Sequence, residues 1–171
     1  MRDTMMNIFK QIWPMIFICS VIMVILRIAY LIKNKQRFVF YKEIFMFVFV
    51  IYMMCLFYVV TFQDIDAKGM SGYNIIPFRE MFRYQIGSCL FFKNVIGNLI
   101  MFVPFGFFTA YIIRETKLKW VLLITLIVSV TIEVTQTQIG RVFDIDDVIL
   151  NIIGGVIGYY LFSFIYHFRN K

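Results

Sequence analysis

Acidic and amide side chains late in the chain recur at helical spacing, which would place them on common helix faces. Glu133 and Gln136 are three residues apart and therefore share a face. Asp144, Asp147 and Asn151 follow at intervals of three and four residues, which makes a second stripe if a helix begins near residue 143. Carboxylates and amides suit proton transfer, cation binding or hydrogen bonding to a ligand, so both stripes are candidate functional surfaces.

Arg141 lies between the two stripes and adds a positive charge to them. A guanidinium can hold a carboxylate with two parallel hydrogen bonds, so we expect Arg141 to pair with Glu133, in competition with the three nearby aspartates. Two chemical alternatives stay open. Glu133 could act as a general base, and Asp144, Asp146 and Asp147 could hold a hard cation. The sequence has no strong metal motif and no Ser–His pair, so we expect no metal and no cofactor.

The same residues also have a purely structural interpretation. Asn, Gln and Glu in membrane helices often bond between helices, at about 0.6 kcal/mol per hydrogen bond on average. Asp144 could simply cap a helix, where an acid favours the N-terminal dipole. Because acids, amides and an arginine occur together, we favour a shared polar pocket formed by Asn98, Glu133, Gln136, Arg141, Asp144, Asp147 and Asn151.

The composition predicts that these residues lie in a polytopic membrane protein. Of 171 residues, 61% are hydrophobic and 16% are charged. That balance excludes a soluble enzyme domain, a disordered chain and a disulfide-stapled module. Five apolar stretches are long enough to span a bilayer as helices: 12–32, 44–62, 95–113, 120–135 and 148–168. We therefore expect an all-α bundle of about five transmembrane helices, with the lipid bilayer as its surroundings.

Basic residues in the loops predict the orientation of the spans. The net charge of +7 fits anchoring at the cytoplasmic face rather than binding to nucleic acid. The loops after the first and third spans and the C-terminal tail carry nine bases and two acids, whereas the opposite side carries seven of each. This places the N-terminus outside, the C-terminus in the cytoplasm and the polar pocket at the extracytoplasmic side.

Small residues and prolines indicate how the helices pack. Gly154 and Gly158 continue the Asp144 stripe as a small-xxx-small pair, which lets another helix approach closely. Pro104 and Gly106 fall inside the third span, where we expect an architectural role.

The segment that precedes the third span contains a second group of candidate residues. Asn74, Pro77 and Phe78 lie in the sequence Tyr73-Asn-Ile-Ile-Pro-Phe-Arg79. This segment is either an ordinary turn on the bilayer surface or a re-entrant or interfacial segment that covers the polar pocket.

Four motifs in order resemble the VanZ-like family. They are Asn74-Ile-Ile-Pro-Phe78, Gly97-Asn98 with Phe102-Val-Pro104-Phe-Gly106, Glu133-Val-Thr-Gln136, and Arg141-Val-Phe-Asp144-Ile-Asp-Asp147 with Asn151 and Gly154-Gly155. The resemblance divides the chain into a variable two-span region, 1–72, and a VanZ-like membrane domain, 73–168. It implies a bacterial plasma-membrane protein and an association with lowered susceptibility to teicoplanin, a glycopeptide antibiotic.

Three functional hypotheses follow from the sequence. The first is a factor that acts on glycopeptides or lipid-linked cell-wall precursors at the outer leaflet through the polar pocket. The second is an intramembrane enzyme with a lipid-linked substrate. The third is a non-catalytic protein that binds an envelope protein partner through the glycine stripe and the second loop.

Overall fold

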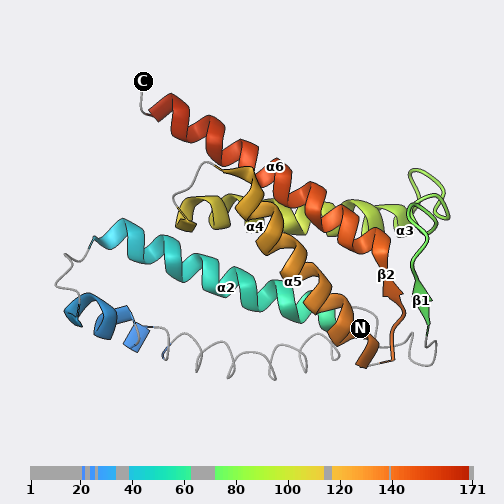
Figure 1. Cartoon of the computed structure of the whole chain (residues 1–171), viewed down its shortest axis with the longest axis horizontal. Coiled ribbons are helices and arrows are strands. Elements are labelled where there is room, and N and C mark those ends of the chain that lie inside the picture. Colours follow the sequence, from blue (N-terminus) through green and yellow to red (C-terminus); the bar gives the residue numbers. More distant parts are fainter. Residues whose placement is uncertain are drawn as a thin grey trace. The chain divides into compact units, whose positions relative to one another are not determined.

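The computed structural model is mostly helical, as Figure 1 shows, and it describes residues 21, 24–25, 27–33, 39–62, 72–113, 117–138 and 140–169. The chain divides into two compact units, Met1–Leu56 and Phe57–Lys171. All candidate site residues belong to the second unit. The helical fold class predicted from the sequence is confirmed.

The first unit contains most of helix α2 (Phe40–Phe62), which coincides with the second predicted span. Near its start, Glu43 accepts two hydrogen bonds from the Arg27 guanidinium, from Nε at 2.7 Å and from Nη2 at 2.9 Å. The first predicted span, residues 12–32, lies largely outside the described residues.

The third predicted span is a helical stretch made of three consecutive elements. These are the short helix α3 (Cys89–Phe91), the π-helical turn η2 (Phe92–Ile96) and helix α4 (Gly97–Ile113). Ser88 caps the stretch, because its Oγ accepts a hydrogen bond from the Phe91 N–H at 3.1 Å. Helix α4 continues through Pro104 for nine more residues.

Two further helices complete the second unit: α5 (Leu118–Gln138) and α6 (Ile145–Arg169). By length and composition, three helices among the described residues could cross a membrane: Cys89–Ile113, Leu118–Gln138 and Ile145–Phe168. They match the last three predicted spans and begin two to six residues earlier than predicted. A total of about five spans stays a prediction.

Glycines bring α6 against α4 at backbone contact. A Cβ on Gly158 would overlap the Val103 carbonyl oxygen, and a Cβ on Gly154 would overlap the Leu99 carbonyl oxygen. Further along, Gly106 of α4 faces the backbone of Gly155 equally closely. The stripe of Gly154 and Gly158 is therefore occupied within the chain by α4 and is not a free surface for an envelope partner.

Apolar packing closes the bundle at the other end of the same helices. Ala110, Val121, Tyr159 and Phe162 form a buried cluster, against which Phe107, Tyr111 and Leu118 pack. Phe107 meets Phe162 edge to face, with their ring centroids 5.8 Å apart. The buried carboxyl groups, by contrast, lie at the end at which α6 begins.

A short parallel pair of strands departs from the all-α expectation. Strand β1 (Tyr73–Asn74) pairs with β2 (Phe143–Asp144), with Tyr73 opposite Phe143 and Asn74 opposite Asp144. Although each strand has two residues, the pair ties the segment before α3 to the residues that immediately precede α6 (Figure 1).

The glycine contacts predict the effect of adding one methyl group. Gly158→Ala should lower the free energy of unfolding by about 1–3 kcal/mol, because the new Cβ meets backbone that cannot move aside. Gly97→Ala is the matched control, because its Cβ would lie 3.5 Å from the Phe92 carbonyl oxygen, an ordinary contact. Thermal unfolding in detergent compares the two. Equal midpoints for Gly158→Ala and Gly97→Ala would contradict the close packing.

Candidate functional site

Polar side chains from β1, β2, α4, α5 and the start of α6 meet at one end of the bundle. We call them the polar cluster, and its members are Asn74, Asn98, Ser129, Glu133, Asp144, Asp146, Asp147 and Asn151. Six of these eight residues were predicted from the sequence as site or loop residues.

Glu133 connects α5 to the residue that precedes α6. Its side chain is only 1% exposed, and Oε2 accepts a hydrogen bond from the Asp144 N–H at 2.9 Å. The predicted ion pair between Glu133 and Arg141 stays a prediction. The Arg141 backbone N–H donates to the Gln136 carbonyl oxygen at 3.0 Å, in the turn after α5.

The positive charge of Arg141 acts on two carboxyl groups of the cluster. It attracts the carboxyl groups of Glu133 and Asp147. Gln136, one helical turn beyond Glu133, is buried on the inner face of α5.

Asp144 caps α6 and also holds β1. Its Oδ1 accepts hydrogen bonds from the Asp146 N–H at 2.9 Å and from Asn74 Nδ2 at 3.0 Å. The first of these bonds is the capping role that the sequence left open. Burial raises the pKa of the Asp144 carboxyl above its ordinary value, whereas the two hydrogen bonds act in the opposite direction.

Two contacts join α6 to its neighbours inside the bundle. Asn98 of α4 donates from Nδ2 to Asp147 Oδ1. One turn further along α6, Asn151 donates from Nδ2 to Ser129 Oγ of α5 at 2.8 Å. The stripe predicted from spacing therefore faces inward, toward both α4 and α5.

Asp146 fixes the segment that we call the surface loop, residues 75–87. Its carboxylate accepts hydrogen bonds from three backbone N–H groups: those of Phe78, Glu80 at 2.8 Å and Met81 at 3.1 Å. Phe78 has a φ of 67°, a left-handed conformation that non-glycine residues rarely adopt. This conformation turns the backbone N–H groups toward one buried carboxylate.

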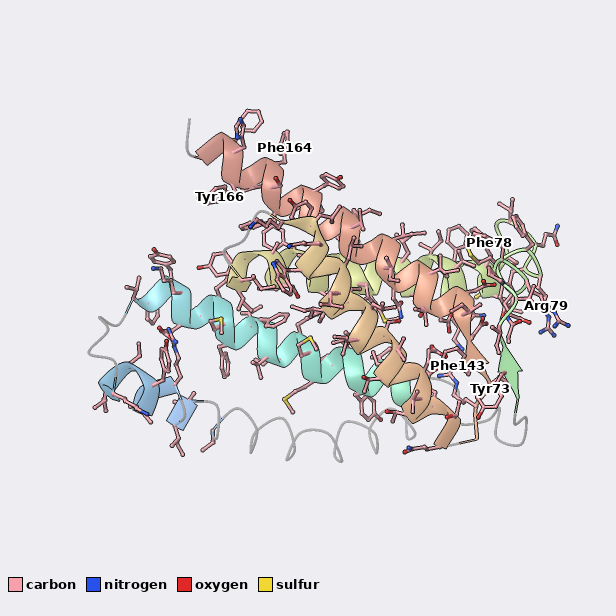
Figure 2. All side chains as sticks on the ribbon, in the orientation of Figure 1. Tyr73, Phe78, Arg79, Phe143, Phe164 and Tyr166 are labelled. Carbon is pink, nitrogen blue, oxygen red and sulfur yellow. The ribbon has the colours of Figure 1, made fainter. Side chains whose placement is uncertain are left out.

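The surface loop exposes large apolar side chains. Phe82 is 85% exposed and Ile86 is 86% exposed, and Phe78 packs its ring 6.4 Å from that of Phe82. Figure 2 shows Arg79 extending outward from the same loop. This composition suits the boundary between water and lipid, where apolar and basic side chains occur together.

The three aspartates do not converge on one cation. Asp144 bonds to Asn74, Asp146 to the surface loop and Asp147 to Asn98, so their carboxylates are directed to different partners. Among the described residues, no group of three His, Cys, Asp or Glu side chains is placed to hold a metal ion.

The sequence analysis missed two residues of the cluster and one beside it. Asp146 was read only as an optional cation ligand, because its partners lie 65–68 residues away in sequence. Ser129 precedes Glu133 by four residues, a spacing that could have found it. Tyr84 lies close enough to interact with the charges of Asp144 and Asp147, and burial raises the pKa of its phenol.

Three apolar spans with a buried polar cluster at one end define a helical membrane protein. The chain belongs to the VanZ/LLP1 family, whose family model matches residues 44–166 and thus well over half of the sequence. The match confirms the resemblance carried by the four motifs. No curated protein and no solved structure matches the chain.

The three hydrogen bonds between Asp146 and the surface loop predict a local effect of Asp146→Asn. A hydrogen bond to a charged group contributes about 1.5–3 kcal/mol, and an amide cannot accept from all three N–H groups. We expect hydrogen exchange at Phe78, Glu80 and Met81 to become about tenfold faster or more. Glu80→Gln is the control, because it changes a carboxylate of the same loop that pairs with Arg83. Unchanged hydrogen-exchange rates at these three residues in Asp146→Asn would contradict the role of Asp146 in holding the loop.

Proposed function

We propose that this VanZ/LLP1-family protein lowers the susceptibility of a bacterium to glycopeptide antibiotics of the teicoplanin type. It acts at the outer face of the plasma membrane, on the antibiotic or on lipid-linked cell-wall precursors, through the polar cluster. The observation that carries the proposal is the convergence of buried carboxylates and amides at one end of three apolar spans. Family membership supports the association with glycopeptides.

The free energy needed to place polar groups in a membrane supports a functional role for the cluster. An aspartate in the middle of a membrane costs about 2.5–3.5 kcal/mol on insertion scales. Each interhelical hydrogen bond contributes only about 0.6 kcal/mol on average. Four carboxyl groups gather in one cluster, and ionisable side chains gathered in a membrane protein commonly mark a site for a ligand or ion.

The surface loop supports a position at the bilayer boundary. Its apolar side chains continue into those of α3 and η2, where Leu90 and Phe92 are exposed as well. In the proposed orientation the loop rests on the outer leaflet, where lipid-linked precursors and lipophilic glycopeptides are found. The polar cluster then lies directly beneath it.

The proposed orientation predicts which positions react from outside the cell. In a variant without Cys19, Cys55 and Cys89, we expect Arg79→Cys to react with a membrane-impermeant maleimide in intact cells. Lys117→Cys, in the connection between α4 and α5, should react only after the membrane is opened. Both side chains are exposed, so accessibility within the protein does not distinguish them. The reverse labelling pattern would place the cluster at the cytoplasmic side.

The functional role predicts the outcome of a complementation series scored against teicoplanin and vancomycin. In a strain that the wild-type protein protects from teicoplanin, Glu133→Gln and Asp147→Asn should return the inhibitory concentration to that of the empty vector. Both variants keep the side-chain shape and replace a carboxyl group with an amide. Val134→Ala is the control, because Val134 neighbours Glu133 on α5 and faces outward.

Immunoblots of membrane fractions verify that every variant reaches the membrane. Full protection by both Glu133→Gln and Asp147→Asn at wild-type levels would contradict the proposed function.

A further inference from the structure

The surface loop presents large apolar side chains to its surroundings. Four of them are more than half exposed: Ile75, Ile76, Phe82 and Ile86. Two arginines of the same loop, Arg79 and Arg83, are exposed as well. Large apolar patches are rare on soluble surfaces, so a patch of this kind marks an interaction site. The partner of the loop must accept both apolar side chains and positive charge.

The length of the third span indicates that this partner is the bilayer. The helical stretch Cys89–Ile113 has 25 residues, whereas about 20 residues cross the hydrocarbon core. Its only charged residue, Lys93, occurs in the first turns, and long basic side chains near the end of a span reach the headgroups. Leu90 and Phe92 are exposed in the same turns and join the apolar surface of the loop to that of the span. The surface loop therefore lies at the level of the headgroups.

Asp146 holds the loop in the conformation that exposes these side chains. Its buried carboxylate accepts hydrogen bonds from three backbone N–H groups of the loop. These bonds fix the loop backbone against the start of α6, while Phe82 and Ile86 stay exposed. The apolar surface is therefore preorganised, which lowers the entropy lost when it enters an interface.

The two arginines favour lipids of one charge. Arg79 extends outward from the loop, as Figure 2 shows. The Arg83 side chain is 70% exposed and pairs at 3.1 Å with Glu80, the one acid of the loop. Because an exposed ion pair is weak, Arg83 can exchange this carboxylate for a phosphate, whose oxygens a guanidinium binds with two hydrogen bonds. Choline and ethanolamine cancel the charge of the lipid phosphate, so anionic headgroups are attracted most strongly.

We propose that the surface loop inserts into the adjacent leaflet and concentrates anionic phospholipids around it. In this arrangement Phe82 and Ile86 lie among the upper parts of the acyl chains, and Arg79 and Arg83 bind lipid phosphates. The inference goes beyond the proposed function, because it concerns the lipid contact of the loop and requires neither a glycopeptide nor a particular leaflet.

Fluorescence quenching in nanodiscs tests the lipid contact. The full chain without native cysteines carries Ile86→Cys labelled with bimane, in equal amounts of phosphatidylglycerol and phosphatidylcholine. A doxyl quencher near the headgroup is placed on one lipid or on the other, at the same mole fraction. An arginine beside an anionic surface favours binding by up to about fivefold. Since Glu80 competes for Arg83, we expect labelled phosphatidylglycerol to quench about twofold more strongly than labelled phosphatidylcholine.

Matched variants separate insertion of the loop from selection of the lipid. Arg79→Gln combined with Arg83→Gln should keep quenching by both lipids and make the two equal. Lys119→Gln is the control, because it removes a positive charge that lies over Trp120 at the other end of α5. This variant should keep the preference for phosphatidylglycerol.

Three results would overturn the inference. Bimane that aqueous iodide quenches and neither doxyl lipid reaches would show a surface for a soluble partner instead. Equal quenching by the two lipids in the chain with both arginines would exclude selection of anionic headgroups. A preference that the double arginine variant retains, or that Lys119→Gln also abolishes, would exclude Arg79 and Arg83 as its source.

The inference and the proposed function fail separately. If the loop shows no lipid preference while Glu133→Gln still abolishes protection, the lipid inference is wrong and the proposed function stands. If the loop concentrates phosphatidylglycerol but the cluster variants protect fully, the lipid contact is supported and the proposed function is wrong.

Discussion

Polar groups inside a bilayer must find partners within the protein, because lipid offers them no hydrogen bonds. The residues at the beginning of α6 supply several of these partners. Asp144, Asp146 and Asp147 each contact a different element: β1, the surface loop and α4. Glu133 adds α5 through the Asp144 N–H. One short acidic segment therefore organises the surrounding helices and the loop.

The glycine packing and the polar cluster depend on each other. Gly154 and Gly158 allow α6 to touch the backbone of α4. At that separation the short side chain of Asn98 reaches Asp147. With a larger residue at either glycine, the two helices would move apart and the amide would lose its partner. Interhelical distance is thus set by residues without side chains, and the chemistry at the end of the bundle follows from it.

Much of this arrangement was predictable from helical spacing. The last three spans and the inward direction of Asp147 and Asn151 follow from periodicity, which is a local property of the chain. The hydrogen bond that the Glu133 carboxylate accepts from the Asp144 N–H was not predicted, because it depends on how the turn between α5 and α6 folds. The contacts of Asp146 with the surface loop join segments more than sixty residues apart, and no local pattern encodes such a contact.

The convergence of helices on the start of α6 is the central claim, and disulfide cross-linking measures it most directly. The experiment uses a chain without native cysteines. Ser129→Cys combined with Asn151→Cys then replaces one side chain of α5 and one of α6, whose Oγ and Nδ2 atoms lie 2.8 Å apart. We expect this pair to form an intramolecular disulfide rapidly under mild oxidation in membranes. Ser129→Cys with Ile153→Cys, whose second position faces outward on α6, should not. Equal cross-linking of both pairs, or none in the first, would contradict the account.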